Sequence, residues 1–158
     1  MRLTRLLVLF ALVLATASPA YADATYIMGW NRTVGNQRVR GFSIGAGAMI
    51  AAEFEYANSS EDVEEGAPGL RTFMGNVLIQ TPVPVSGFQP YITGGGGWYK
   101  EKVQEFEETA FAFNGGVGVK IKIWGPIRTR IDTRWFKLKG DPVFATHRRF
   151  YAGINVQF

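Results

Sequence analysis

The alternation of apolar and polar residues is the feature that most constrains how this chain can fold. About eight segments alternate with a period of two, and turn-forming residues separate them. A period of two is the side-chain period of a β-strand, and these segments are rich in aromatic and β-branched residues. They lie at approximately 24–32, 38–48, 50–57, 71–80, 89–99, 109–121, 126–137 and 148–158. The predicted fold class is therefore all-β.

The character of the two strand faces indicates which one is buried. The polar faces of segments 50–57 and 126–137 carry Glu53, Glu55, Arg128, Arg130, Asp132 and Arg134. The opposite faces contain many Gly, Ala and Thr, and they lack the bulky side chains that the core of a soluble barrel requires. In a bilayer the apolar face of a barrel points outward and the polar face inward. The pattern predicts an eight-stranded antiparallel up-and-down transmembrane β-barrel over residues 23–158.

The connections between the predicted strands alternate in length. Turns are expected at about 48–50, 81–88 and 122–125, and outer loops at about 33–37, 58–70, 100–108 and 138–147. Short turns on one side and longer, charged loops on the other are typical of transmembrane barrels. Aromatic residues near both strand ends predict the two girdles of the membrane–water interfaces. This placement assigns Trp30, Tyr56, Tyr99 and Trp135 to the loop side, and Tyr91 and Trp124 to the turn side.

The first 22 residues have the three parts of a secretory signal peptide. Arg2 and Arg5 form a positive region, residues 6–15 an apolar region, and Ala20-Tyr21-Ala22 a small-x-small cleavage site. Ten apolar residues are too few for a spanning helix, which needs about 20. Cleavage after residue 22 would lower the formal net charge from +4 to +2, because two arginines and no acid are removed. This small excess of base and the absence of a basic stripe argue against nucleic-acid binding.

The end of the chain carries the clearest family resemblance. The segment 149–158 has apolar residues at every second position before a terminal Phe, with Phe150, Ile154, Val156 and Phe158 among them. It resembles the carboxy-terminal signature of bacterial outer-membrane barrels, and the stretches 73–77 and 89–97 are similar to the middle of small OmpA/OmpX-like, porin-family-type domains. The resemblance implies recognition by the barrel-assembly machinery and a location in the bacterial outer membrane.

The charged side chains predicted to face the lumen are expected to pair. Counted inward from the periplasmic turns, the acidic and basic rows share similar heights at about 3.3 Å per residue. The predicted network joins Glu53, Glu55 and Asp132 with Arg128, Arg130 and Arg134, and places Lys120 nearby. Eight strands leave an interior just wide enough for side chains. The network is therefore expected to plug the lumen.

Other chemistry finds weaker support. His147 is the only histidine, and a lipid-modifying enzyme would need a serine and a carboxylate beside it, for which Ser59, Ser60 and Glu61 are the candidates. A lone loop histidine is usually solvated, so no enzyme is expected. Gly94–Gly97 lacks the Lys-Ser/Thr and the helix of a phosphate loop, and indicates a bend of the barrel instead. With no Cys and one His, no metal site or cofactor is predicted.

The sequence thus predicts an integral outer-membrane barrel with a structural or surface-interaction role. Its expected partners are outer-membrane lipid and lipopolysaccharide, and a surface partner at the acidic run 61–65 or the mixed segment 100–108. Two alternatives stay open. One is a narrow passive channel for small solutes or ions. The other is a soluble periplasmic lipocalin-like barrel, which would turn the apolar residues toward an internal ligand.

Overall fold

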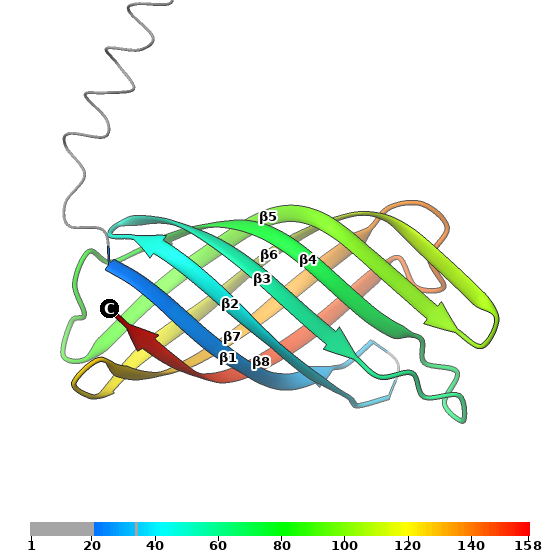
Figure 1. Ribbon diagram of the computed structural model, residues 1–158, viewed down its shortest axis with the longest axis horizontal. Helices are drawn as coiled ribbons and strands as arrows, with labels where there is room; N and C mark the ends of the chain where they lie inside the picture. The colour runs from blue at the N-terminus through cyan, green and yellow to red at the C-terminus, as the bar shows by residue number, and fades with distance from the viewer. Residues whose placement is uncertain (1–20, 34) are drawn as a thin grey trace, which may run out of the picture.

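Eight antiparallel strands close into a single barrel in the computed structural model, which describes residues 21–33 and 35–158 (Figure 1). Each strand pairs with its neighbours in sequence, and β1 pairs with β8. The strands are β1 (Tyr21–Asn31), β2 (Gln37–Gly47), β3 (Ile50–Ser59), β4 (Gly69–Gln80), β5 (Phe88–Val103), β6 (Phe106–Trp124), β7 (Ile127–Leu138) and β8 (Thr146–Gln157). The all-β, eight-stranded up-and-down prediction is confirmed.

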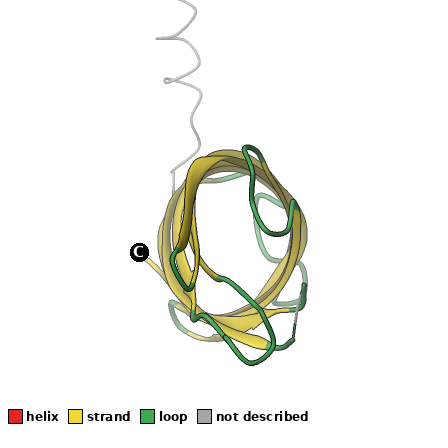
Figure 2. Cartoon of the chain, turned by 90° about the vertical axis from the view of Figure 1, so that its right-hand side faces the viewer, coloured by secondary structure: helices red, strands yellow, loops and turns green. Residues whose placement is uncertain are grey.

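The two ends of the described chain meet at one rim of the barrel. The amide of Ala22 donates to the carbonyl of Phe158 over 3.0 Å, and the amide of Phe158 donates to the carbonyl of Ala22 over 2.9 Å. The three connections at this turn end are residues 48–49, 81–87 and 125–126. Figure 2 views the opposite end, where the longer loops surround the mouth of a closed ring of strands.

The barrel wall is apolar outside and largely polar inside. Outward side chains such as Ile44, Val77 and Ile92 are more than half exposed, whereas inward residues such as Glu55 and Arg134 are fully buried. This arrangement is the reverse of a soluble barrel and is the one that a bilayer requires. The lipocalin-like alternative is therefore wrong, because it needs the apolar face to line the interior. Within the described residues, no helix is long and apolar enough to cross a membrane.

The largest departure from the predicted boundaries is in the β5–β6 hairpin. Segment 100–108 was expected to form an outer loop, but the ladder continues to the pair Val103↔Phe106 and only Gln104 and Glu105 form the turn. Gln104 has a φ of 53°, as a two-residue hairpin turn requires. The paired strands extend because the alternation persists there with polar side chains on the outer face. The hairpin therefore projects beyond the other strands (Figure 1).

The start of β1 lies close to the predicted cleavage site. Tyr21 already pairs with Gly47 of β2, two residues before the predicted mature terminus. Residues 1–20 lie outside the described residues, so most of the predicted signal peptide does too. Its cleavage stays a prediction.

The aromatic girdle residues occupy outward positions at both rims, with two exceptions. Trp30, Trp124 and Trp135 are exposed on the outer wall, and Tyr56 is partly exposed beside Phe42 and Phe73. Tyr91 and Tyr99 are buried in the lumen at 3% and 1% exposure, so their assignment to the girdles is wrong. Their place along the strand suggested an interface, but their parity puts them on the same face as Gln89 and Glu101.

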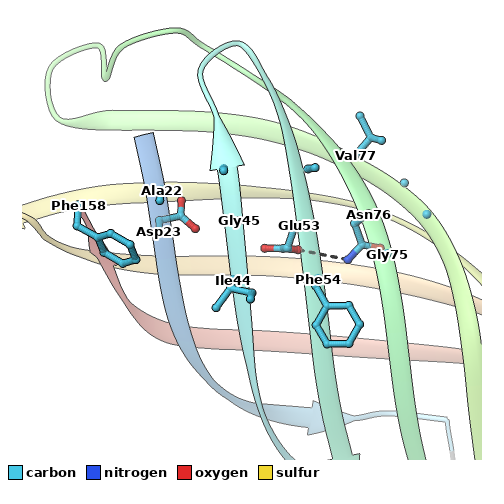
Figure 3. A pocket seen from close by; sticks show the side chains of 14 residues that line it. Ala22, Asp23, Ile44, Gly45, Glu53, Phe54, Gly75, Asn76, Val77 and Phe158 are labelled. Atoms are coloured by element: carbon cyan, nitrogen blue, oxygen red, sulfur yellow. Dashed lines mark hydrogen bonds between the residues drawn. The ribbon is translucent and has the colours of Figure 1, made fainter. Parts of the chain in front are cut away.

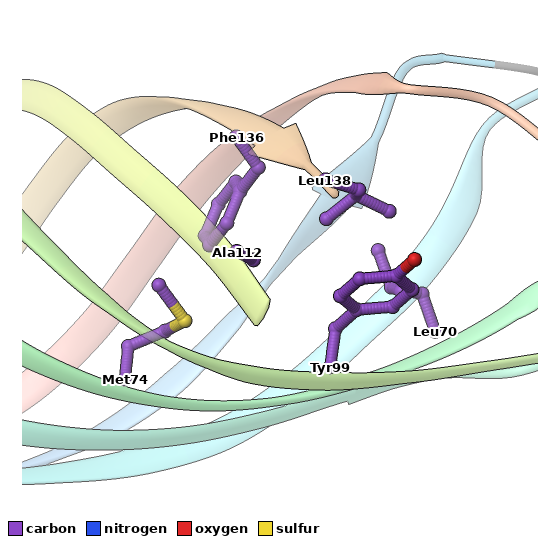
Figure 4. Packing of buried hydrophobic residues seen from close by; sticks show 6 residues of the cluster. All are labelled: Leu70, Met74, Tyr99, Ala112, Phe136 and Leu138. Carbon is purple, nitrogen blue, oxygen red and sulfur yellow. The ribbon is translucent and has the colours of Figure 1, made fainter. Parts of the chain in front are cut away.

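An apolar cluster closes the lumen toward the loop end (Figure 4). Phe136 and Leu138 of β7 lie beside Tyr99 of β5, Ala112 of β6, and Leu70 and Met74 of β4. Tyr99 adds a hydrogen bond of 2.5 Å from its hydroxyl to the carbonyl of Lys139 in the β7–β8 loop. The cluster thus packs the inner faces of the four adjacent strands β4 to β7 against one another.

Candidate functional site

A network of buried charges fills the middle of the lumen. Arg134 lies 2.7 Å from Glu55, 2.9 Å from Glu53 and 3.5 Å from Asp132. Arg130 pairs with Glu53 and lies 3.0 Å from Asp132. All five side chains are at most 5% exposed. The structure therefore joins strands β3 and β7 across the barrel through two arginines and three acids, as the sequence predicts.

Uncharged donors and acceptors extend this network. The hydroxyl of Tyr91 accepts a hydrogen bond of 2.7 Å from Arg130 and donates to Asp132. Asn76 of β4 donates to Glu53 over 3.3 Å, and Tyr151 of β8 donates to Glu55 over 3.1 Å. Tyrosines in contact with arginine also present their ring faces, and the Arg130 guanidinium lies 5.0 Å from the Tyr91 ring centre. These neutral partners were not predicted.

Arg149 forms a second layer above the network. It donates to the Thr72 hydroxyl over 2.8 Å, to the Tyr151 hydroxyl over 3.2 Å and to the Leu70 carbonyl over 3.2 Å. Its guanidinium also lies 4.8 Å from the Phe136 ring centre. Arg149 therefore links the charged middle of the lumen to the apolar cluster, a role that the sequence analysis missed.

Glycines on the inner face make room for these large side chains. A Cβ atom on Gly118 would lie 2.4 Å from the Cβ of Asp132 and 2.5 Å from the Tyr91 hydroxyl. A Cβ on Gly116 would lie 2.8 Å from Cγ of Arg134. All three distances are shorter than real side chains allow, so only glycine fits beside the network at these positions.

Two further predicted residues lie toward the turn end, and Lys120 is near the network as predicted, with its Nζ 6.0 Å from the Tyr91 ring centre. Lys120 pairs with Asp23 of β1 over 2.5 Å. Arg128 donates to the side-chain oxygen of Gln89 over 2.7 Å and to that of Gln157. The prediction that Arg128 joins the acidic residues is wrong, because its position two residues into β7 places it at the level of the amides, below the carboxylates.

His147 is buried rather than solvated, which corrects the expectation for a loop histidine. It occupies the second position of β8, faces the lumen and is 3% exposed. Its ring nitrogens lie 3.1 Å from Asn31 and 3.1 Å from the carbonyl of Phe144, and Glu101 is 3.8 Å away. Among the hydrogen bonds of the described residues, none joins His147 to Ser59 or Ser60, and Ser59 bonds to the Leu70 backbone instead.

The outer surface carries a lipid-facing groove of about 660 Å³ across β1–β5 (Figure 3). Its apolar rim includes Ile44, Phe54, Val77 and Phe158. Small residues form its floor, among them Ala52, Gly75 and Gly94. Figure 3 also shows Glu53 and Asn76 pointing toward one another in the same region. Among the described residues, no group of three or more His, Cys, Asp or Glu is placed to hold a metal ion.

The eight-stranded barrel has direct parallels among solved structures. Neisserial surface protein A is 12% identical, with a TM-score of 0.69 over 90% of this chain and 99% of that one. The chain has the fold of bacterial outer-membrane barrels. The N-terminal barrel domain of Pseudomonas aeruginosa OprF is also 12% identical, with a TM-score of 0.68 over 90% of this chain and all (100%) of that one. No protein-family model and no curated protein matches the sequence.

The same barrel fold is also found in an enzyme. The outer-membrane enzyme PagL is 12% identical, with a TM-score of 0.54 over 85% of this chain and 98% of that one. The outer-membrane barrel fold is therefore compatible with catalysis as well as with non-enzymatic roles.

Proposed function

We propose that the protein is an integral barrel of the bacterial outer membrane with a closed lumen and a structural or surface-interaction role. The apolar outer wall, the two aromatic girdles and the fold shared with outer-membrane proteins support this location. Export by a cleaved signal peptide and insertion by the barrel-assembly machinery follow from the same proposal. On β8 the residues Phe150, Ile154, Val156 and Phe158 face outward, where that machinery would meet them.

The filled lumen is the observation that carries the proposal. Three layers follow one another along the axis. The lowest holds Lys120 with Asp23, the middle layer holds the network around Arg130 and Arg134, and the apolar cluster lies above. The middle layer joins the opposite strands β3 and β7 and the lowest layer joins β6 and β1, so an ion would have to break several buried pairs to pass.

The loop end offers the surface for a partner. Strands β5 and β6 contain 16 and 19 residues, whereas the other six contain 10 to 12. The extra length raises a charged hairpin, and Glu61 of the neighbouring loop accepts a hydrogen bond of 2.5 Å from the Gln104 amide at its tip. A hydrogen bond from Lys100 lowers the pKa of Glu107 on this hairpin, beyond the apolar wall. Such a fixed, charged projection suits recognition better than catalysis.

A non-enzymatic role is also supported by the state of His147. Both of its ring nitrogens have partners, the side chain is buried, and no serine contacts it among the hydrogen bonds of the described residues. Acyl transfer or hydrolysis needs a nucleophile within hydrogen-bond reach of its base. We expect His147→Ala to leave lipid A unchanged in a deacylation or acyl-transfer assay, like the wild-type protein. Wild-type turnover that His147→Ala abolishes would overturn this part of the proposal.

Conductance measurements test whether the lumen is closed. Full-length protein purified from the membrane fraction should give a band that shifts on heating, which reports a folded barrel, and should show no unitary conductance steps in planar bilayers. Steady anion-selective steps that Arg130→Ala changes would favour the channel alternative. A protein that leaves the membrane with carbonate and shows no heat shift would contradict the membrane location itself.

A further inference from the structure

Two rows of side chains cross the outer wall of β2–β5 at the loop end, one above the other. The lower row is aromatic and consists of the cross-strand pairs Phe42↔Tyr56, Tyr56↔Phe73 and Phe73↔Trp98. Two residues further along each strand, the upper row consists of Arg40↔Asn58, Asn58↔Arg71 and Arg71↔Lys100. Three cations and an amide therefore lie directly above an aromatic girdle, on the side away from the apolar wall.

Most of the exposed basic residues gather at this level. Of the 15 Lys and Arg beyond residue 22, five are buried in the lumen and one, Lys122, is exposed near the turn end. The remaining nine form an exposed collar at the loop end: Arg32, Arg38, Arg40, Arg71, Lys100, Lys102, Lys137, Lys139 and Arg148. Among the described residues, only Lys100 of this collar makes an ion pair, with Glu107 over 2.6 Å. Eight of the nine cations thus make no ion pair within the part of the chain that the structure describes, although acidic residues such as Glu64, Glu65 and Glu105 lie in the loops at the same end of the barrel.

A polar pocket of about 340 Å³ opens within the upper row. Asn58, Arg71, Lys100 and Lys102 line it, together with Glu61 and Glu107. Glu61 is already engaged by the Gln104 amide, and Glu107 by Lys100. Arg71 and Lys102 make no ion pair among the described residues, so they are free to receive an anion.

We propose that this row binds the phosphate groups of a phosphorylated glycolipid in the outer leaflet, of the lipid A type. The inference rests on the membrane location given under "Proposed function", but not on the closed lumen. Charge complementarity argues for this occupant, because the upper row carries three cations and no acidic residue. The position argues for a lipid, because aromatic side chains mark the interface and cations just beyond it meet the headgroups.

The chemistry of the row matches a phosphate on a sugar. The guanidinium of Arg71 presents two parallel N–H donors that suit two phosphate oxygens. Lys100 can exchange its exposed Glu107 partner for a second contact, and the Asn58 amide is placed to donate to a sugar or ester oxygen. Acyl chains of the same lipid would lie against Tyr56 and Phe73 below.

The test compares two triple variants of the full-length protein in neutral detergent. R40Q/R71Q/K100Q removes the row, and K137Q/K139Q/R148Q removes three collar charges from β7, β8 and the loop between them. The probes are bisphosphorylated lipid A, the same lipid with both phosphates removed, and inorganic phosphate. We expect the first variant to bind bisphosphorylated lipid A at least about tenfold more weakly than wild type, and the second to stay within about threefold. Dephosphorylated lipid should bind wild type at least about tenfold more weakly.

Three results would overturn the inference. Equal affinity for the two lipids would show that phosphate is not recognised. Equal losses of affinity in both variants would show that the lipid is attracted to the collar as a whole and not bound by the upper row. Competition by inorganic phosphate at the concentration of the lipid would indicate a free anion as the ligand. A heat-shifted band for each variant shows that its barrel is folded, so that weaker binding is not caused by misfolding. Absence of the heat shift in the wild-type protein would contradict the proposed function instead.

Discussion

Replacing Arg134 with methionine is expected to lower the free energy of unfolding by about 3–5 kcal/mol. Methionine fills part of the same space but leaves Glu55 without its 2.7 Å cationic partner in a fully buried position. An unpaired buried carboxylate must either stay charged without compensation or take up a proton. Denaturant titration in lipid vesicles, followed by tryptophan fluorescence, measures the difference.

Two controls make this expectation specific. Lys137→Met, three residues along the same strand but exposed, should change the free energy of unfolding by less than about 0.5 kcal/mol. The double variant Arg134→Met with Glu55→Met should recover part of the lost free energy of unfolding, because it also removes the buried Glu55 carboxylate that Arg134→Met leaves unpaired. Wild-type stability in Arg134→Met would show that the network is not needed to hold the barrel closed.

Substitution of Gly29 by alanine is expected to disrupt the seam between β1 and β8. A Cβ atom at Gly29 would lie 1.9 Å from the carbonyl oxygen of Phe150 and 3.1 Å from Cα of Tyr151. These are backbone atoms of the closing strand, so relief requires the two strands to separate. The cost should reach about 3 kcal/mol, the upper part of the usual range for overpacking. Loss of the heat-shifted band and a lower denaturant midpoint would report it.

Gly75→Ala is the matched control for this substitution. Gly75 faces outward on β4, and its added Cβ would have the carbonyl oxygen of Gly96 as its nearest neighbour, at 3.8 Å. The variant should therefore fold like the wild-type protein. Equal denaturant midpoints for the two variants would mean that the β1–β8 seam relaxes readily and that the barrel does not require glycine at position 29.

The strand pattern could be predicted from the sequence because each strand has one face in lipid. Apolar outward residues alternate with polar inward ones wherever the wall crosses the membrane, and the predicted segments correspond to the eight strands. The alternation of apolar and polar residues ends where the barrel wall extends beyond the bilayer. Beyond Trp98 the outward residues of β5 are Lys100 and Lys102, so the paired extension of the β5–β6 hairpin looks like a charged loop.

The interior could be predicted only in part. The odd or even position of a residue along a strand shows whether its side chain faces the lumen, but not which side chain it contacts there. Arg130 and Arg134 meet the acids of β3 because they lie deep in the barrel, whereas Arg128 lies too near the turn end. Tyr91 was assigned by its place along the strand, although its parity already placed it in the lumen. Arg149 depends on how β8 closes against β4 across the axis, which no local pattern encodes.

The closing ladder gives the folded state an all-or-none character. Seven of the eight strand pairings join neighbours in sequence, and hairpins of this kind assemble locally. The eighth joins β1 to β8, so it cannot form before β8 is present, and until then two strand edges have unpaired backbone groups. A chain that lacks β8 is therefore not a smaller barrel. It is an open sheet whose unpaired backbone N–H and C=O groups cannot be accommodated in the hydrocarbon of a bilayer.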